Sequence, residues 1–313
     1  MQTSILDAKH FHDEEAAFAY LEARVWPNGP ICPHCGGVER ISKMQGKSTR
    51  VGVYKCYQCR KPFRVTVGTV FEASHVPLRL WLQAVHLLAS SKKGISSNQL
   101  HRTLGVTLKT AWFMSHRIRE AMRVLGVEPM GGSGQTVEID ETAQGRIDGA
   151  PKRGRAIMGA YGRTVLTLVE RGGAARSFHI EGSTLAQLLP IIRANVAKET
   201  AVITDSASWY RLLPLYIDVG SHDTIDHTSK EYVRREGEKV ISTNTVEGYY
   251  SIFKRGMKGV YQHCAEKHLH RYLAEFDFRY SNRVRLGVDD VARADRALSG
   301  IVGKRLTYRP PHH

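Results

Sequence analysis

Apolar side chains recur with a helical period through much of the first 125 residues of the chain. In residues 10–25, Phe18, Leu21 and Val25 fall on one face and predict an amphipathic helix. The stretch PLRLWLQAVHLLASS repeats the pattern, and Pro77 suits the first turn of a helix. This part of the chain is therefore expected to be mainly helical, apart from one cysteine-containing stretch.

Residues 96–126 predict two further helices joined by a short turn at Gly105. Ser96 or Ser97 suits the N-cap of the first helix, and Thr107 suits that of the second. This arrangement resembles a helix-turn-helix, whose second helix usually enters the major groove of DNA. The alternative is an ordinary helical hairpin with a solvated basic face.

In the helix-turn-helix interpretation, the basic side chains of the second helix are the candidate DNA contacts. Cationic groups attract phosphates and can donate hydrogen bonds to base edges. The candidates are Lys109, His116, Arg117 and Arg119.

From Gln135 onward the apolar pattern changes from helical to strand-like. Strands are expected in TVEIDE, AIMGAYG (156–162), TVLTLVER, RSFHIEG, AVITD and HDTIDHTS, with a basic loop at 146–156 and helices in LAQLLPIIRANV and WYRLLPLY. Strands first, followed by alternating strands and helices, predict an α/β domain with a mixed sheet flanked by helices.

A helix is expected in the stretch STNTVEGYYSIFKRGMK (242–258). Its apolar residues recur at spacings of four, three and four, and Asn244 suits its N-cap. Glu247 and Lys254 are seven residues apart, so both project from one helical face. Two interpretations of Glu247 follow: part of a capping box, or a carboxylate of a phosphoryl-transfer site.

Composition and charge narrow the class of protein. The chain has 313 residues, of which 42% are hydrophobic and 24% charged, as in an ordinary globular protein. No apolar run approaches the roughly 20 residues that span a bilayer, so no membrane partner is expected. The acidic N-terminus lacks a secretory pattern, which favours a cytoplasmic location. A formal charge of +15 and a pI near 9.7 favour a polyanionic partner, nucleic acid first.

Four of the five cysteines form two close pairs with the spacing of a zinc ribbon. Cys32 and Cys35 make one C-x2-C unit, and Cys56 and Cys59 make the other after twenty residues. Each unit can bind one side of a tetrahedral Zn²⁺ through two thiolates, so one structural zinc is expected. The redox alternative would need a βαβ unit beside one C-x2-C pair, and that pattern is absent.

Two aspartates are expected at the ends of strands, where reactive groups collect in open α/β sheets. Asp140 ends VEID and Asp205 ends AVITD. Either one alone is commonly a turn or cap residue. Together with Glu247 they would form a carboxylate triad able to hold two Mg²⁺ ions about 4 Å apart at a phosphodiester.

Three other acids compete with Asp140 for the first position. Glu138 shares its strand face but is expected in mid-strand, Glu141 points to the opposite face, and Asp148 lies in the basic loop. Asp140 is therefore preferred.

The order of these features resembles bacterial insertion-sequence transposases of the DDE class, and more narrowly those with an ISXO-type transposase domain behind a zinc ribbon. The blocks that carry the resemblance are VEIDET, TDSASWY, HTSKEYVR, NTVEGYYSIFKRGMKGVYQH and KHLHRYLAEFDFRYSNR. The resemblance covers nearly the whole chain, from about Asp13 to Arg285, and NTVEGYYSIFKRG is its most specific block.

The resemblance implies a ribonuclease-H-like core with two catalytic Mg²⁺ or Mn²⁺ ions. The implied metal ligands are Asp140, Asp205 and Glu247, with Lys254 near the scissile phosphate and Arg255 as a further DNA contact. The implied accessory residues are Asn244, which replaces the third acid in some relatives, and His227, which lies in a recurrent block.

The implied function is binding of terminal inverted repeats, metal-dependent cleavage and strand transfer, by a dimer or larger assembly on double-stranded DNA in the nucleoid of a bacterium. The alternatives are a DNA-binding regulator, an inactive transposase remnant, or a ribonuclease-H-like nuclease without strand transfer.

The expected organisation has four parts, and the segment EPMGGSG (128–134) is the best linker. They are an N-terminal helix and zinc ribbon (1–76), a helix-turn-helix region (77–130), the catalytic domain (131–285) and a C-terminal helix and tail (286–313).

Overall fold

A computed structural model describes residues 4–124, 126, 128–151 and 161–307. The chain divides into two compact units. The first comprises Met1–Arg123 and Asp289–His313, and the second comprises Val124–Val288. The second unit is thus inserted between two segments that fold together.

The first unit is built mainly from helices. They are α1 (Glu14–Val25), α2 (Leu78–Ser90), α3 (Ser97–Leu104), α4 (Leu108–Met122) and α8 (Asp290–Ser299), with short helical turns η1 (Ile5–Asp7) and η2 (Lys9–Phe11). The side chains expected on the apolar face of α1 include Phe18 and Leu21, and both are buried. Trp81, Leu88 and Leu298 lie in the same core, which places α8 with helices from the start of the chain.

The helix–turn–helix of α3 and α4 follows the local signals in the sequence. Ser96 caps α3 by accepting the N–H of Gln99, and Thr107 caps α4 by accepting the N–H of Thr110. Gly105 ends α3 with a φ of 66°, a left-handed conformation that glycine adopts without steric cost. The predicted caps and turn are therefore confirmed.

An ion pair joins α8 to α1 within the first unit. Arg24 donates to Asp295 at 2.6 Å, and the Tyr20 hydroxyl donates to the same carboxylate at 2.7 Å. The C-terminal helix, expected as a separate segment with the tail, is therefore part of this unit.

A small antiparallel sheet carries the cysteines. Its strands are β1 (Ile41–Lys43), β2 (Tyr54–Cys56) and β3 (Pro62–Phe63), paired in the order β1-β2-β3. Gly52 adopts a φ of 73° and lies in a turn, so that β2 starts after it.

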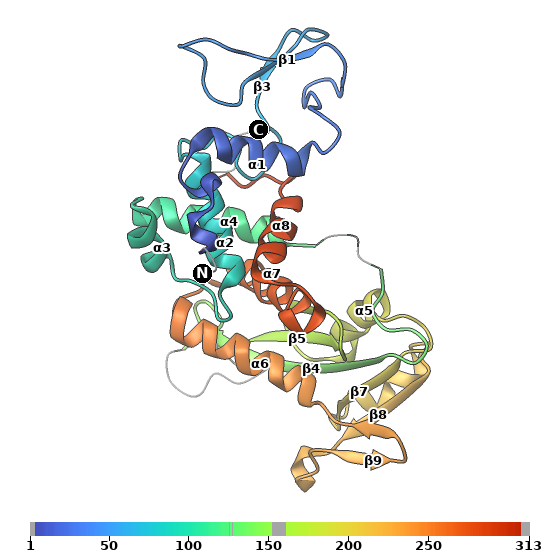
Figure 1. The fold of residues 1–313 in the computed structure, drawn as a ribbon. Helices are drawn as coiled ribbons and strands as arrows, with labels where there is room; N and C mark the ends of the chain where they lie inside the picture. Colours follow the sequence, from blue (N-terminus) through green and yellow to red (C-terminus); the bar gives the residue numbers. More distant parts are fainter. Residues whose placement is uncertain (1–3, 125, 127, 152–160, 308–313) are drawn as a thin grey trace. The chain divides into compact units, whose positions relative to one another are not determined.

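The second unit contains a five-stranded mixed sheet in the order β6-β5-β4-β7-β8 (Figure 1). The strands are β4 (Thr136–Arg146), β5 (Gly162–Glu170), β6 (Ala175–Ile180), β7 (Ala201–Asp205) and β8 (Ser221–Ile225). β4, β5 and β6 pair antiparallel, whereas β7 pairs parallel with both β4 and β8.

Helices cover both faces of this sheet. On one face α5 (Leu185–Asn195) and the short helix η3 (Tyr210–Leu215) pack against alternate apolar residues of β4, β5 and β7. On the other, α6 (Asn244–Gly256) and α7 (Leu269–Ser281) pack against alternate residues of β5 and β6. Figure 1 shows α6 alongside β4 and β5. This is the predicted mixed α/β architecture, and its strand order is that of a ribonuclease-H-like fold.

The strand that carries Asp140 is longer than the sequence predicted. β4 continues to Arg146 because its antiparallel pairing with β5 extends that far, with an irregularity between Ala143 and Arg146. The parallel pairing with β7 stops at Glu138. Asp140 therefore lies in mid-strand, but beyond the end of the β4–β7 hydrogen bonds.

Several elements fall outside the sequence prediction. A two-stranded hairpin, β9 (Arg234–Glu236) and β10 (Lys239–Ile241), precedes α6 and was not anticipated. The remaining short helical elements are η4 (His227–Ser229), η5 (Met257–Tyr261), η6 (Glu266–His268) and η7 (Val284–Leu286). Most of the strand expected at 156–162 and of the basic loop lies outside the described residues. Within the described part of the chain, no helix has the length and apolarity needed to cross a bilayer.

Candidate metal centre and catalytic site

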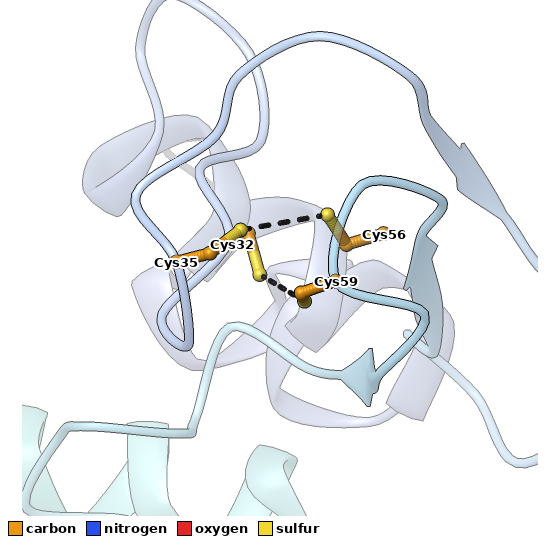
Figure 2. Close-up of side chains that lie close together, drawn as sticks. All are labelled: Cys32, Cys35, Cys56 and Cys59. Atoms are coloured by element: carbon orange, nitrogen blue, oxygen red, sulfur yellow. Dashed lines mark hydrogen bonds between the residues drawn. The ribbon is translucent and has the colours of Figure 1, made fainter.

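Four cysteine sulfurs gather at one point of the first unit. Their Sγ atoms all lie within 4.8 Å of one another, with 3.6 Å between Cys32 and Cys59 and 3.7 Å between Cys35 and Cys56. Figure 2 shows the side chains converging from the two C-x2-C turns. A zinc tetrahedron with Zn–S bonds of about 2.3 Å has edges of about 3.8 Å. The donor set and its spacing therefore fit one structural Zn²⁺.

Tight turns prepare these sulfurs for metal binding. The Gly36 N–H donates to the Cys32 carbonyl at 2.9 Å, and Gly36 adopts a φ of 73°. N–H groups of Cys59 and Gln58 point at the Cys56 sulfur and lower its pKa to about 7, despite the opposing effect of burial. Because zinc binds the thiolate form, these N–H groups favour metal binding at Cys56, whereas burial and the neighbouring sulfurs raise the pKa of Cys35.

The sheet register brings Asp140 and Asp205 to neighbouring positions. Glu138 on β4 pairs with Ile203 on parallel β7, so Asp140 and Asp205 stand at the same level two residues further along. Side chains two residues apart on a strand share a face. Both aspartates therefore point to the face that α6 and α7 cover.

Glu247 projects from the first turn of α6. Its Oε1 accepts a hydrogen bond of 3.0 Å from the Thr243 hydroxyl and lies 3.3 Å from Nε2 of His227. The predicted N-cap is wrong by one residue: Thr243 occupies that position, and Asn244 is the first, exposed residue of the helix. The capping box is absent because the Thr243 hydroxyl is bound to Glu247 and makes no cap hydrogen bond.

The electrostatics of Asp140 link the two strands and the helix. Burial and, after it, the neighbouring charges of Asp205 and Glu247 raise its pKa to about 7. Lys254 and the Glu141 N–H, which donates to Oδ1 at 2.8 Å, act in the opposite direction. The charges of Asp205, Glu247 and Lys254 therefore all act on the Asp140 carboxylate.

This site has the hard oxygen ligands that Mg²⁺ and Mn²⁺ prefer, and mutual repulsion that a cation would relieve. The carboxylate oxygens of this site lie further apart than the cysteine sulfurs. Among the described residues, the four cysteines form the group of three or more potential ligands whose donor atoms all lie within 4.8 Å of one another.

The three competing acids have other surroundings. Glu138 is fully buried and accepts hydrogen bonds from the start of α6 and from Arg171. Glu141 points to the opposite face, where burial raises its pKa to about 8 beside Tyr210. Asp148 is exposed and paired with a neighbouring arginine. These positions favour Asp140 as the first carboxylate of the site.

Comparison with known families bears on both sites. Residues 132–281 match the ISXO2-like transposase domain, and residues 12–62 match the transposase zinc-ribbon domain. The chain therefore carries an ISXO2-like transposase domain behind a transposase zinc ribbon. A protein of the transposable element ISH50 from Halobacterium salinarum, described as uncharacterized, is 27% identical over 288 residues, which are 88% of this chain and 93% of that protein.

The matched segments contain both candidate sites. The zinc-ribbon match ends at residue 62, after the four cysteines, and the transposase match includes Asp140, Asp205, Glu247 and Lys254. Lys254 and Arg255 are exposed on α6, and the Lys254 ammonium lies 5.8 Å from the centre of the Tyr250 ring. A transposase domain and its zinc ribbon imply that DNA is the partner.

Most of the basic candidate DNA contacts on α4 are buried within the first unit. Lys109 is exposed, but His116, Arg117 and Arg119 are no more than 7% exposed. Arg117 donates to the carbonyls of Glu72 and Leu306 at 2.9 and 3.1 Å. Three of the four predicted contacts are therefore not on the described surface, because distant segments of the chain cover the second half of α4.

The sequence did not predict the hydrogen bonds of Glu138 and Arg171 with the segment that begins α6. A signal was present in the pattern: Glu138 is an acid at an inward-facing position of a strand, two residues before Asp140. A buried carboxylate requires a cationic or hydrogen-bonding partner. Only the fold identifies that partner.

Proposed function

We propose that this chain is an active transposase of an insertion sequence. In this account Asp140, Asp205 and Glu247 are the metal ligands and Lys254 contacts the DNA end. The observation that carries the proposal is the β4–β7 register, which aligns the two aspartates on the face of the sheet under the helix of Glu247.

The proposed mechanism assigns a separate task to each side chain. The three carboxylates hold Mg²⁺ or Mn²⁺, whose chemistry is activation of a water or 3′-hydroxyl and neutralisation of the leaving oxygen. Lys254, exposed two helical turns after Glu247, binds a phosphate of the element end. His227 and Thr243 fix the orientation of the Glu247 carboxylate through their contacts with Oε1.

DNA binding is assigned to exposed basic surfaces of the first unit. Lys109 lies near the start of α4, where a helix-turn-helix would meet base edges. The zinc ribbon adds exposed cations at Arg40, Lys43, Lys47, Arg50, Arg60 and Lys61. In the proposed assembly, two or more copies hold the two ends of the element, because strand transfer joins both ends to one target.

Product analysis tests this proposal against its alternatives. The full-length protein, loaded with zinc, is incubated with a labelled fragment of its own element end and a supercoiled plasmid, with and without Mg²⁺. We expect 3′ cleavage at the end and labelled plasmid joined to it, both dependent on Mg²⁺. Cleavage without joining would identify a nuclease, and binding without cleavage would identify a regulator or a remnant.

A further inference from the structure

A buried carboxylate outside the metal site receives the first turn of α6. Glu138 on β4 is completely buried. Its Oε2 accepts the backbone N–H groups of Thr245 and Val246 at 2.7 and 3.0 Å, and its Oε1 accepts the Thr245 hydroxyl at 2.8 Å. The carboxylate therefore satisfies helix N–H groups that usually depend on a cap residue in the same helix.

Arg171 completes this arrangement from the loop after β5. Its Nε donates to Oε1 of Glu138 at 2.6 Å. The remaining nitrogens donate to the carbonyls of Val240 and Ser242 at 2.5 and 2.9 Å, and to the Ser242 hydroxyl at 3.1 Å. One guanidinium thus ties the segment entering α6 to the strand that carries the first aspartate.

In this arrangement the hydroxyl of the N-cap residue does not cap the helix. Thr243 is at the N-cap, yet its hydroxyl makes no cap hydrogen bond. It donates to Glu247 at 3.0 Å and lies 3.0 Å from His227. Because Glu138 accepts the helix N–H groups, the Thr243 hydroxyl is available to orient the carboxylate of Glu247.

A second contact fixes α6 one turn further along. The Tyr250 hydroxyl donates to the backbone carbonyl of Asp140 at 2.6 Å and lies 3.2 Å from that of Val165. Glu247 is therefore held between two attachments of α6 to β4, one at Glu138 and one at Asp140. A displacement of the first turn would move Glu247 relative to Asp140.

We propose that Glu138 and Arg171 are positioning residues that set the place of Glu247 in the metal site. Glu138 caps α6 from the neighbouring strand, and Arg171 locks the incoming chain to it. Neither residue binds metal in this account, which rests on the proposed function of Asp140, Asp205 and Glu247 as metal ligands.

The test uses the zinc-loaded full-length protein with Glu138→Gln, Arg171→Met and Arg171→Lys. Arg176→Met is the matched control, because Arg176 is also partly buried in this unit but donates to Asn195 and Glu128, away from α6. Hydrogen exchange of residues 242–250 reports the first turn of α6 without metal. Mn²⁺ binding, measured by electron paramagnetic resonance, reports the ligand geometry without DNA or cleavage.

We expect the Thr245 and Val246 amides to exchange about tenfold faster in Glu138→Gln and Arg171→Met, the effect typical of a lost helix cap. Mn²⁺ affinity should fall by about tenfold in the same variants. Arg171→Lys retains the charge and should recover part of both, and Arg176→Met should stay within about twofold of wild type. If Glu138→Gln does not fold, the two Arg171 variants carry the test, since Arg171 is 27% exposed.

Unchanged exchange, or unchanged Mn²⁺ affinity despite faster exchange, would overturn the proposal, as would equal effects in the control. Failure of the proposed function looks different. In that case the wild type either does not bind Mn²⁺ or binds it with an affinity that Glu247→Gln leaves unchanged. If the positioning role alone is absent, the wild type still binds Mn²⁺ through Glu247.

Discussion

The carboxyl group of Asp277 ionises less readily in the folded protein than in water. Asp277 on α7 accepts the Ser177 N–H and hydroxyl, both at 2.7 Å, and the Tyr249 hydroxyl at 2.5 Å. These bonds favour the carboxylate, yet burial outweighs them and raises its pKa to about 7. Asp277 is therefore a half-buried acid that remains largely protonated below neutral pH.

This shift predicts how stability depends on pH. Because the pKa of Asp277 rises on folding from 3.8 to about 7, the folded state keeps a proton that the unfolded state has lost. Asp277 thus makes the second unit less stable as pH rises from about 4 to 7. Asp277→Asn should flatten this decline in urea unfolding at pH 5, 6 and 7. The same slope in both proteins would contradict the assigned cause.

Local sequence patterns predicted the positions of the helices better than they predicted which segments pack around each helix. The apolar residues expected on one face of α6 include Val246 and Phe253, and both are fully buried. The C-x2-C spacing likewise predicted the cysteine cluster, because each turn is local. The burial of the second half of α4 was not predictable, since Arg117 donates hydrogen bonds to the carbonyls of Glu72 and Leu306, which are distant in sequence.

The candidate catalytic site shows the same division. Apolar strand patterns sufficed to suggest Asp140 and Asp205, the helical pattern of residues 242–258 suggested Glu247, and the family resemblance implied the metal-binding role of all three. The pairing of β4 with β7, which aligns the aspartates, depends on the sheet order and is not contained in either strand. The roles of Glu138 and Arg171 depend on that long-range geometry as well.

The contact between α1 and the zinc ribbon permits a prediction with a matched control. A Cβ at Gly52 would lie 2.2 Å from the Phe18 ring, whereas one at Gly68 would meet nothing within 4 Å. The two glycines have φ values of 73° and 74°. Gly68→Ala should cost only the left-handed strain, about 1 kcal/mol. Gly52→Ala should cost about 1–3 kcal/mol more from overpacking. Chemical denaturation of both variants checks this, and equal costs would contradict a close Phe18 contact.

For the whole molecule, the two compact units predict a divided response to loss of zinc. The four cysteines belong to the first unit, and the five-stranded sheet belongs to the second. Because structural zinc contributes directly to folding of small modules, chelation should unfold the ribbon. Hydrogen exchange should rise strongly in residues 32–63 and stay unchanged in β4 and β7. Equal loss of protection in both units would show that they fold as one.

In the proposed function, three carboxylates form one catalytic site in the second unit. The most direct test compares single-turnover cleavage of the element end by wild type, Asp140→Asn, Asp205→Asn and Glu247→Gln, at equal DNA occupancy. Glu238→Gln, an exposed acid in the β9–β10 hairpin, is the matched control. Loss of several kcal/mol of transition-state stabilisation predicts a fall of about 1,000-fold or more in each triad variant. The control should cleave at the wild-type rate. A triad variant that cleaves as fast as the control would contradict the account.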